Sequence, residues 1–278
     1  MERICIVAIA KDELPFIDEW LAYHRIIGID HVFLYDDEEG APLFKHLKEN
    51  DFVTVIPWFK QRLLHTKVRN QVRAYSHAIQ NHIQHFDWVS FLDIDEFFVF
   101  RNCDNIKIFL EGFADVASIS LNWHVFGHNG YYDDPEGLIL PKLTRRMHPP
   151  SQNVKSITRV HLIEKVGQHH CKLISGKRVD GNNRKFNNDL YDGKTDVAHV
   201  NHYQCRSFSR WMKRADRGDV NFHHYNSPPE HQWRLTKEGC LKQFVTTVAL
   251  NKNEHIDCYM QKFESQLSAY LFNEVHSK

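Results

Sequence analysis

The first hundred residues alternate between short apolar runs and stretches in which apolar residues recur every three or four positions. Continuous apolar runs of this length are typical of strands buried on both faces, and the three-to-four spacing is typical of helices. The runs predict strands at 4–10, 31–35, 52–57 and 87–92, and the stretches between them predict helices at 15–28, 42–49 and 68–86. Strands that alternate with helices predict an α/β fold, with a mostly parallel, twisted, Rossmann-like sheet flanked by helices.

The second part of the chain has a less regular pattern. It predicts β-rich fragments at 116–121, 137–140 and 156–162, followed by helices at 207–217, 241–250 and 258–272. No internal repeat and no low-complexity tract divides the sequence. We therefore expect one α/β domain over residues 1–220 and a C-terminal helical extension over 221–278 that packs on it.

Composition narrows the class of protein. Of the 278 residues, 42% are hydrophobic, which is enough for a substantial core. Lys plus Arg and Asp plus Glu both number 35, so no global field recruits nucleic acid, and an anionic ligand needs a local cluster of cations. The six cysteines are scattered without a C-x-x-C pair, which favours reduced thiols over a zinc site or a disulfide framework.

The N-terminal apolar run is too short for a signal peptide, and no stretch approaches the ~20 apolar residues of a membrane span. We therefore expect a cytoplasmic protein of bacterial type, soluble or peripheral at the inner face of the membrane. The basic segment 210–217, which also carries a tryptophan, is either a solvated helix face or a contact with an anionic, lipid-linked molecule.

Three carboxylates, at positions 93, 95 and 96, follow the apolar segment 88–92 and are followed in turn by two phenylalanines. If the strand continues, Asp93 and Asp95 project from the same face, roughly 6 to 7 Å apart along the backbone. Two like charges that close favour a divalent cation with hard oxygen ligands, Mn²⁺ or Mg²⁺. Asp36 and Asp37 follow the second strand, and ligands of parallel sheets bind at such carboxyl ends. Glu96 would point to the opposite face, and we leave it outside the candidate site.

Four segments, taken together and in order, carry a resemblance to a known family. They are the segment that begins KDELPFIDEW at position 11, the run DWVSFLDIDEF at 87–97, WHVFG at 123–127 and HYQCRS at 202–207. The chain resembles the GT-A glycosyltransferases of the family 2 and family 92 kind over roughly residues 3 to 220. The resemblance implies a GT-A fold and a metal-dependent transferase that uses a nucleoside-diphosphate sugar, for which we expect a UDP-sugar.

The resemblance also implies roles for individual residues. Asp93 and Asp95 match the D-x-D motif that holds Mn²⁺ or Mg²⁺, and His202 is a candidate third ligand, with His199 as its competitor. The residues expected to bind the nucleotide sugar are Ala10, Lys11, Glu13, Asp36, Gln71, Asp93, Lys155 and Arg206. For the polar helix face that carries Gln71, simple solvation is an equal alternative.

The residues predicted to contact the sugar and to activate the acceptor lie between positions 123 and 136. Trp123 and Gly127 are expected to contact a sugar ring, because aromatic faces stack on sugars and glycine permits close approach, although a core tryptophan beside a turn explains them equally. An inverting transfer needs a carboxylate base, and the candidates are Asp133, Asp134 and Glu136, for which a surface acidic turn is the alternative.

The resemblance, taken together with these residues, implies an inverting hexosyltransferase that acts on a hydroxyl of a surface glycan, as in polysaccharide or lipopolysaccharide biosynthesis. Its partners are the nucleotide-sugar donor and a glycan acceptor, which could be lipid-linked. Two other functions stay open. One is metal-dependent nucleotidyl or phosphoryl transfer, for which the chain lacks a P-loop glycine motif. The other is a non-catalytic protein that binds a sugar nucleotide.

Overall fold

The computed structural model describes residues 2–61, 69–186, 194–217, 229–249 and 252–276. The chain divides into two compact units, the first made of residues 1–123 and 152–200 and the second of residues 124–151 and 201–278. The division into a domain of 1–220 and an extension of 221–278 stays a prediction.

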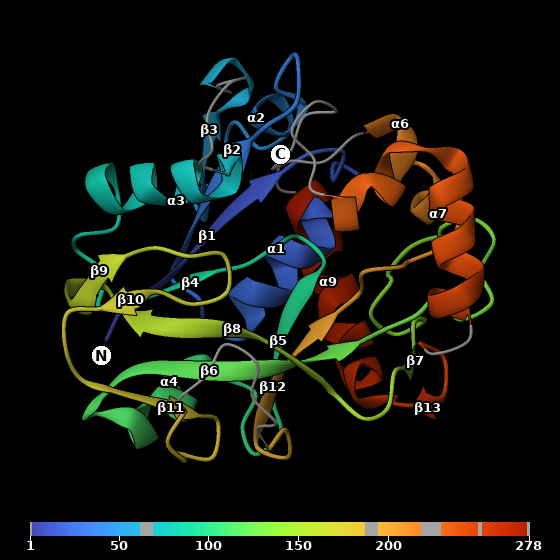
Figure 1. Ribbon diagram of the computed structural model, residues 1–278. Helices are drawn as coiled ribbons and strands as arrows, with labels where there is room; N and C mark the ends of the chain where they lie inside the picture. The colour runs from blue at the N-terminus through green and yellow to red at the C-terminus, as the bar shows by residue number, and fades with distance from the viewer. Residues whose placement is uncertain (1, 62–68, 187–193, 218–228, 250–251, 277–278) are drawn as a thin grey trace. The chain divides into compact units, whose positions relative to one another are not determined.

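The first unit begins with four parallel strands, shown from blue to teal in Figure 1. They lie in the order β3-β2-β1-β4, with bounds β1 (Ile4–Ala10), β2 (His31–Asp36), β3 (Val53–Pro57) and β4 (Trp88–Phe91). All four coincide with predicted strands to within one residue at each end, because each is a short, continuous apolar run. Ala10 lies opposite Asp36 in the register, so the chain leaves β1 and β2 at the same edge of the sheet.

The sheet continues beyond β4 in the order β8-β6-β12-β5, and β11 pairs with β6. The bounds are β5 (Glu96–Phe100), β6 (Val116–Val125), β8 (Ser151–Arg159), β11 (Lys177–Asp180) and β12 (Ala198–His202). β8 runs antiparallel to β4, whereas β11 runs parallel to β6. The predicted α/β class with a mostly parallel sheet is therefore confirmed.

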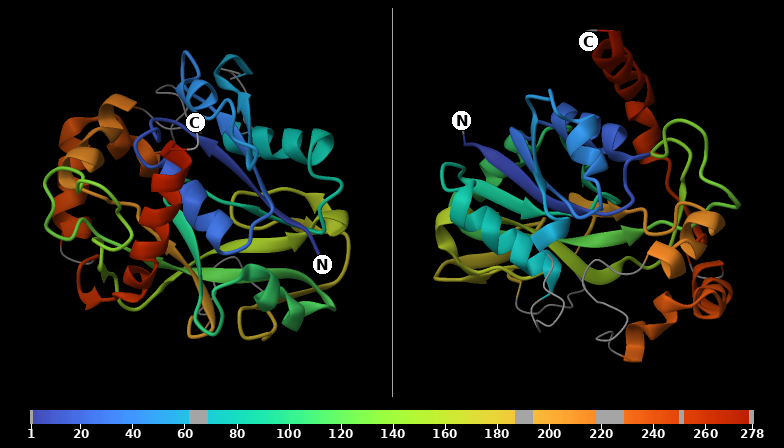
Figure 2. Two further views of the ribbon diagram at one scale, coloured as in Figure 1. Left: turned by 180° about the vertical axis from the view of Figure 1, so that it is seen from behind. Right: turned by 90° about the horizontal axis from the view of Figure 1, so that it is seen from above.

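Helices α1 and α3 of the first unit contact this sheet. Their bounds are α1 (Ile17–Ile26), α2 (Pro42–His46), α3 (Asn70–Asn81) and α4 (Ile106–Leu110). α3 contacts β1, and α1 contacts β5, as the view from behind in Figure 2 shows. Trp20 and Tyr23 of α1 donate to backbone carbonyls of β5, at 2.9 Å to Glu96 and 2.5 Å to Phe98. The smaller elements are η1 (Phe59–Gln61), η2 (Glu111–Phe113), η3 (Val160–Leu162), β9 (Ile163–Lys165) and β10 (Lys172–Leu173).

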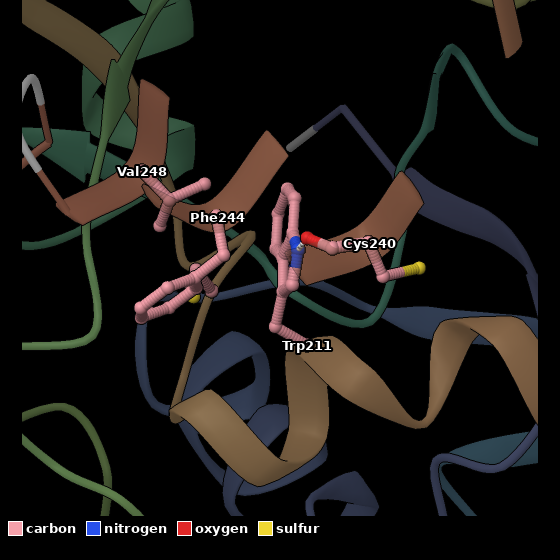
Figure 3. Close-up of a cluster of buried hydrophobic side chains, with 5 residues drawn as sticks. Trp211, Cys240, Phe244 and Val248 are labelled. Atoms are coloured by element: carbon pink, nitrogen blue, oxygen red, sulfur yellow. Dashed lines mark hydrogen bonds between the residues drawn. The ribbon is translucent and has the colours of Figure 1, made fainter. Parts of the chain in front are cut away.

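The second unit has a core of its own. Its elements are β7 (Arg145–Arg146), α5 (Phe208–Met212), α6 (Arg214–Arg217), η4 (Pro229–Leu235), α7 (Lys237–Gln243), η5 (Phe244–Val248), β13 (His255–Ile256), η6 (Tyr259–Phe263) and α9 (Glu264–His276). Trp211, Cys240, Phe244 and Val248 pack together with Cys205 (Figure 3), and the Trp211 indole N–H donates to the Cys240 carbonyl at 2.9 Å.

Two predicted elements of the later sequence differ from the structure. The fragment 137–140 is not a strand, because the backbone N–H groups of Lys142 and Leu143 both bond to the Ile139 carbonyl in a turn that buries Ile139. The fragment 156–162 belongs to a strand that begins earlier, at Ser151, and ends at Arg159.

The predicted C-terminal helices exist with other bounds. The segment 207–217 is divided into α5 and α6, and 258–272 begins as the 3-10 turn η6 before α9. α7 begins before the predicted residue 241, because the Thr236 hydroxyl accepts the Gly239 N–H at 3.0 Å and caps it. Residue 250 lies outside the described residues. Within the described ranges, no helix combines the length and the apolar character that crossing a membrane requires.

One cap of the first unit gives a test of this local structure. The Asn105 side chain accepts the Lys107 N–H at 2.8 Å and caps α4. Asn105→Ala should lower the free energy of unfolding by about 1 kcal/mol in a urea titration. Asn102→Ala, at an exposed position nearby, is the control. Equal midpoints for the two variants would contradict a stabilising role for the cap.

Candidate functional site

The acidic run forms a turn between two strands. β4 ends at Phe91, and the Glu96 N–H donates to the Asp93 carbonyl at 3.1 Å before β5 begins at Glu96. Asp93 and Asp95 therefore do not alternate along one strand, and the expectation that the strand period places them on one face is wrong. The reason is that the run of apolar residues consists of two strands, β4 and β5, which do not pair with each other.

Lys155 of β8 holds this turn from the neighbouring strand. Its ammonium nitrogen lies 3.1 Å from Asp93 Oδ2 and 3.1 Å from Glu96 Oε2. The side chains of Lys155 and Glu96 are 1% and 0% exposed, whereas that of Asp93 is 37% exposed. One buried cation thus bridges a buried carboxylate and a carboxylate that solvent and ligands can reach.

The other oxygen of Asp93 is held by α3. Gln71 Nε2 donates to Asp93 Oδ1 at 2.6 Å and to the Tyr75 hydroxyl at 2.7 Å, and Gln168 Nε2 donates to Gln71 Oε1 at 2.6 Å. Gln71 is itself buried. The Asp93 carboxylate is therefore fixed in direction at both oxygens.

Burial and charge set the protonation of this cluster. Burial alone lowers the pKa of Lys155, but Asp93 and Glu96 outweigh it, so the pKa lies above its usual value and Lys155 stays cationic. Burial raises the pKa of Glu96, against the opposing effect of Lys155. Burial and the nearby Lys155 charge lower the pKa of His169 to about 4, so this histidine is neutral at physiological pH. Its ring meets that of Trp123 edge-on, with 5.3 Å between centroids.

The loops after β1 and β2 are joined by hydrogen bonds. The Asp36 carboxylate is buried and accepts the backbone N–H groups of Glu38 at 3.3 Å and Phe44 at 3.0 Å. The Asp12 N–H donates to Glu38 Oε2 at 3.0 Å, and the Asp37 N–H to the Ala10 carbonyl at 2.9 Å. Burial raises the pKa of Asp36. Asp36 thus shapes the loop, and Lys11 and Glu13 are half-buried on the adjoining loop after Ala10.

The predicted catalytic carboxylates lie in the second unit and differ in their surroundings. Asp134 accepts the Ser207 hydroxyl at 2.7 Å and the Arg210 Nε–H at 3.2 Å, so both of its oxygens bind the first turn of α5. Asp133 and Glu136 are exposed. Asp134 therefore has a structural role in holding the start of α5.

The other predicted residues on β12 and after β6 occupy buried positions. His202 ends β12, Arg206 precedes α5, and both are less than a tenth exposed. His199, the competing metal ligand, turns Nδ1 toward the Thr195 carbonyl at 2.9 Å. A Cβ at Gly127 would collide with the Lys252 carbonyl, so the close approach of the protein's own backbone explains that glycine.

The structure thus brings together Gln71, Asp93 and Lys155, which lie far apart in the sequence. It adds Glu96, Tyr75 and Gln168, which sequence reasoning does not place in the site. For Glu96 a signal exists, since a carboxylate surrounded by apolar residues in the sequence requires a buried partner. Nothing in the sequence indicates Gln168.

Comparison with known proteins identifies the chain's relatives. The model of glycosyltransferase family 92 matches residues 4–243. A family 92 protein of Ricinus communis is 23% identical over 262 residues, which cover 91% of this chain and 40% of that protein. A family 92 protein of Arabidopsis thaliana is 25% identical over 194 residues, covering 63% of this chain and 32% of that protein. The chain therefore spans less than half the length of these relatives.

The similarity of the chain to solved structures is distant, and two of them serve as examples. HddC from Yersinia pseudotuberculosis has a TM-score of 0.37 and 12% identity over 65% of this chain and 91% of that chain. A Drosophila galactosyltransferase mutant in complex with manganese, UDP-Gal and xylobiose has a TM-score of 0.32 and 10% identity over 72% of this chain and 70% of that chain. At these values the likeness carries no argument about activity.

The buried cation gives the site's first prediction. Lys155→Met leaves Glu96 buried without its cation, so the free energy of unfolding should fall by about 3 kcal/mol near neutral pH. The fall should be smaller at about pH 5 than at about pH 8, because burial raises the pKa of Glu96 and protonation removes the unpaired charge.

Urea titrations at both pH values measure the effect. Lys165→Met, an exposed position on β9, is the matched control and should change the free energy of unfolding little. A Lys155→Met variant as stable as this control would show that the buried ion pair contributes no net stability.

Proposed function

The chain belongs to glycosyltransferase family 92, and on this basis we propose that it transfers a hexose from a nucleoside-diphosphate sugar, a UDP-sugar, to a hydroxyl of a glycan. The observation that carries the proposal is the Asp93 carboxylate, which Lys155 and Gln71 hold in a turn beyond the carboxyl end of a parallel strand. Ligands of open α/β sheets bind at this position.

A divalent cation, Mn²⁺ or Mg²⁺, fits Asp93 and Asp95. Both carboxylates are partly exposed. An ionised carboxylate offers about four acceptor positions, and the bonds from Gln71 and Lys155 use two of those at Asp93. Within the described ranges, no group of three or more His, Cys, Asp or Glu side chains is arranged to hold a metal ion. This agrees with the habit of Mg²⁺, which takes one or two carboxylates and completes its shell with substrate phosphates and water. The cation would neutralise charge on the departing diphosphate.

The protein's own residues serve binding and orientation. Lys155 adds a permanent positive charge beside the proposed diphosphate position, and the joined loops that carry Lys11 and Glu13 supply backbone groups for the nucleotide. Arg206, which precedes α5, is the proposed second cation. Because no group of three such side chains is arranged for a metal within the described ranges, the proposed cation rests on Asp93 and Asp95 without the predicted third ligand His202. Trp123 keeps its proposed part in contacting the sugar, whereas the approach of the Lys252 carbonyl already accounts for the predicted sugar contact Gly127. A cytoplasmic location and a lipid-linked acceptor complete the proposal.

Inverting transfer needs a base, and the three candidates are not equivalent. Both Asp134 oxygens bind α5, whereas Asp133 and Glu136 are exposed. A base must accept a proton from the acceptor hydroxyl within hydrogen-bonding reach, so a carboxylate already held by two donors is the poorer choice. We assign the role to Asp133 or Glu136.

The metal assignment is tested with the donor. Thermal shift with UDP-glucose, UDP-galactose, their N-acetyl forms and GDP-sugars should show one donor class that stabilises the protein only when Mn²⁺ is present. Asp95→Ala should abolish metal-dependent turnover of that donor and leave the fold intact. Asp115→Ala, an exposed position outside the site, is the control.

A folded Asp95→Ala variant with near-normal turnover would overturn the metal assignment. Consumption of a nucleoside triphosphate instead of a sugar nucleotide would favour nucleotidyl transfer. Binding of a donor without turnover, across glycan acceptors, would favour a non-catalytic role.

The base assignment predicts different outcomes for neighbouring residues. Either Asp133→Asn or Glu136→Gln should lower kcat for transfer by about 100-fold or more, with donor binding retained. Asp134→Asn should instead lower the thermal midpoint, because it weakens the contacts with Ser207 and Arg210. Steady-state kinetics and calorimetry separate these effects. Loss of kcat in Asp134→Asn alone, at an unchanged midpoint, would reverse the assignment.

A further inference from the structure

Glu96 is the carboxylate of the acidic turn that the proposed chemistry does not use. Its side chain is 0% exposed, so it cannot contact a donor or a solvated cation. A buried carboxylate costs several kcal/mol unless it is paired and hydrogen-bonded, so its presence needs a reason.

Glu96 is connected to Asp93 in two ways through a single oxygen. Oε2 accepts the backbone N–H of Asp93 at 2.9 Å, and the same oxygen lies 3.1 Å from Lys155 Nζ. Lys155 in turn lies 3.1 Å from Asp93 Oδ2. Glu96 therefore holds the main chain of Asp93 directly and the carboxylate of Asp93 through Lys155.

The core holds Glu96 itself in place. Its carbonyl accepts the Trp20 indole N–H from α1 at 2.9 Å, and Trp20 is fully buried. Phe97 and Phe98, which follow in β5, are buried as well. Because its backbone is bonded to the core and its carboxylate to the Asp93 N–H, Glu96 fixes the partly exposed turn relative to the packed core.

We infer that Glu96 is a positioning residue of the active site, which sets the position and direction of the Asp93 carboxylate for the cation and the diphosphate. The inference rests on the proposed function, because Asp93 acts there. A purely structural ion pair would need only the contact between Glu96 and Lys155. The additional bond to the Asp93 N–H makes the geometry of the turn depend on the same oxygen.

The second oxygen of Glu96 provides a sharp test. Oε1 is buried and has no hydrogen-bond partner among the described residues. Glu96→Gln keeps one carbonyl oxygen that can take the place of Oε2, with the amide nitrogen at the Oε1 position, whereas Glu96→Met keeps the size of the side chain and loses the acceptor. Glu111→Met, at an exposed position of η2, is the matched control for the new methionine.

The experiment measures kcat, the Mn²⁺ concentration at half-maximal turnover, and hydrogen exchange of the peptide that contains Asp93. In Glu96→Met we expect kcat to fall about 100-fold and the Mn²⁺ requirement to rise about 10-fold, because an error near 1 Å in a catalytic group has effects of this size. The Asp93 amide should exchange about 5-fold faster. Glu96→Gln should restore all three values to within about 10-fold of the wild type.

A merely structural role would lower the thermal midpoint of Glu96→Met and leave kcat per folded molecule and the Mn²⁺ requirement unchanged, which would overturn the inference. If the wild type turns over no sugar nucleotide, the proposed function fails separately. Hydrogen exchange at Asp93 and Mn²⁺-dependent thermal shift then still judge the positioning, and unchanged values in Glu96→Met would reject it.

Discussion

The buried ammonium of Lys155, placed between Asp93 and Glu96, is the interaction on which the site depends. Removing a lysine from water costs several kcal/mol, and two carboxylates at 3.1 Å compensate for that cost. In return, the cation allows two acids to lie next to each other at the end of an apolar sheet. Without Lys155, mutual repulsion and burial would force one of the acids to take up a proton or turn toward solvent.

The parallel strands supply the frame for this interaction. β1 and β2 end opposite each other, with Ala10 beside Asp36, and hydrogen bonds from Asp12 and Asp37 join the loops that follow them. β4 ends earlier along the sheet, with Phe91 opposite Val7 of β1. The antiparallel strand β8 then brings Lys155 to the turn after β4. Asp36, which the sequence predicts to bind the nucleotide sugar, accepts two backbone N–H groups and so shapes its own loop. An aspartate thus shapes the loop after β2, whereas the aspartate after β4 pairs with Lys155 and stays partly exposed.

Membership in glycosyltransferase family 92 and the geometry of the turn support one another while resting on different observations. The family match extends over residues 4–243, whereas the site's hydrogen bonds involve a few side chains of the first unit. The acidic segment lies in the second unit, where Asp134 is held by α5 and Asp133 and Glu136 are exposed. The contrast between a fixed and an exposed carboxylate is what makes the base assignment specific enough to test.

The sequence by itself determined the α/β class and the four parallel strands, because continuous apolar runs separated by helical periodicity permit few other arrangements. It also determined that Asp93 and Asp95 end an apolar run. Only the tertiary structure decided that β4 stops at Phe91 and that Glu96, expected to point away, is the partner of Lys155. Glu96 and Lys155 are 59 positions apart, and a contact between such distant residues leaves no periodic signal in the sequence. It depends on which strands become neighbours in the sheet.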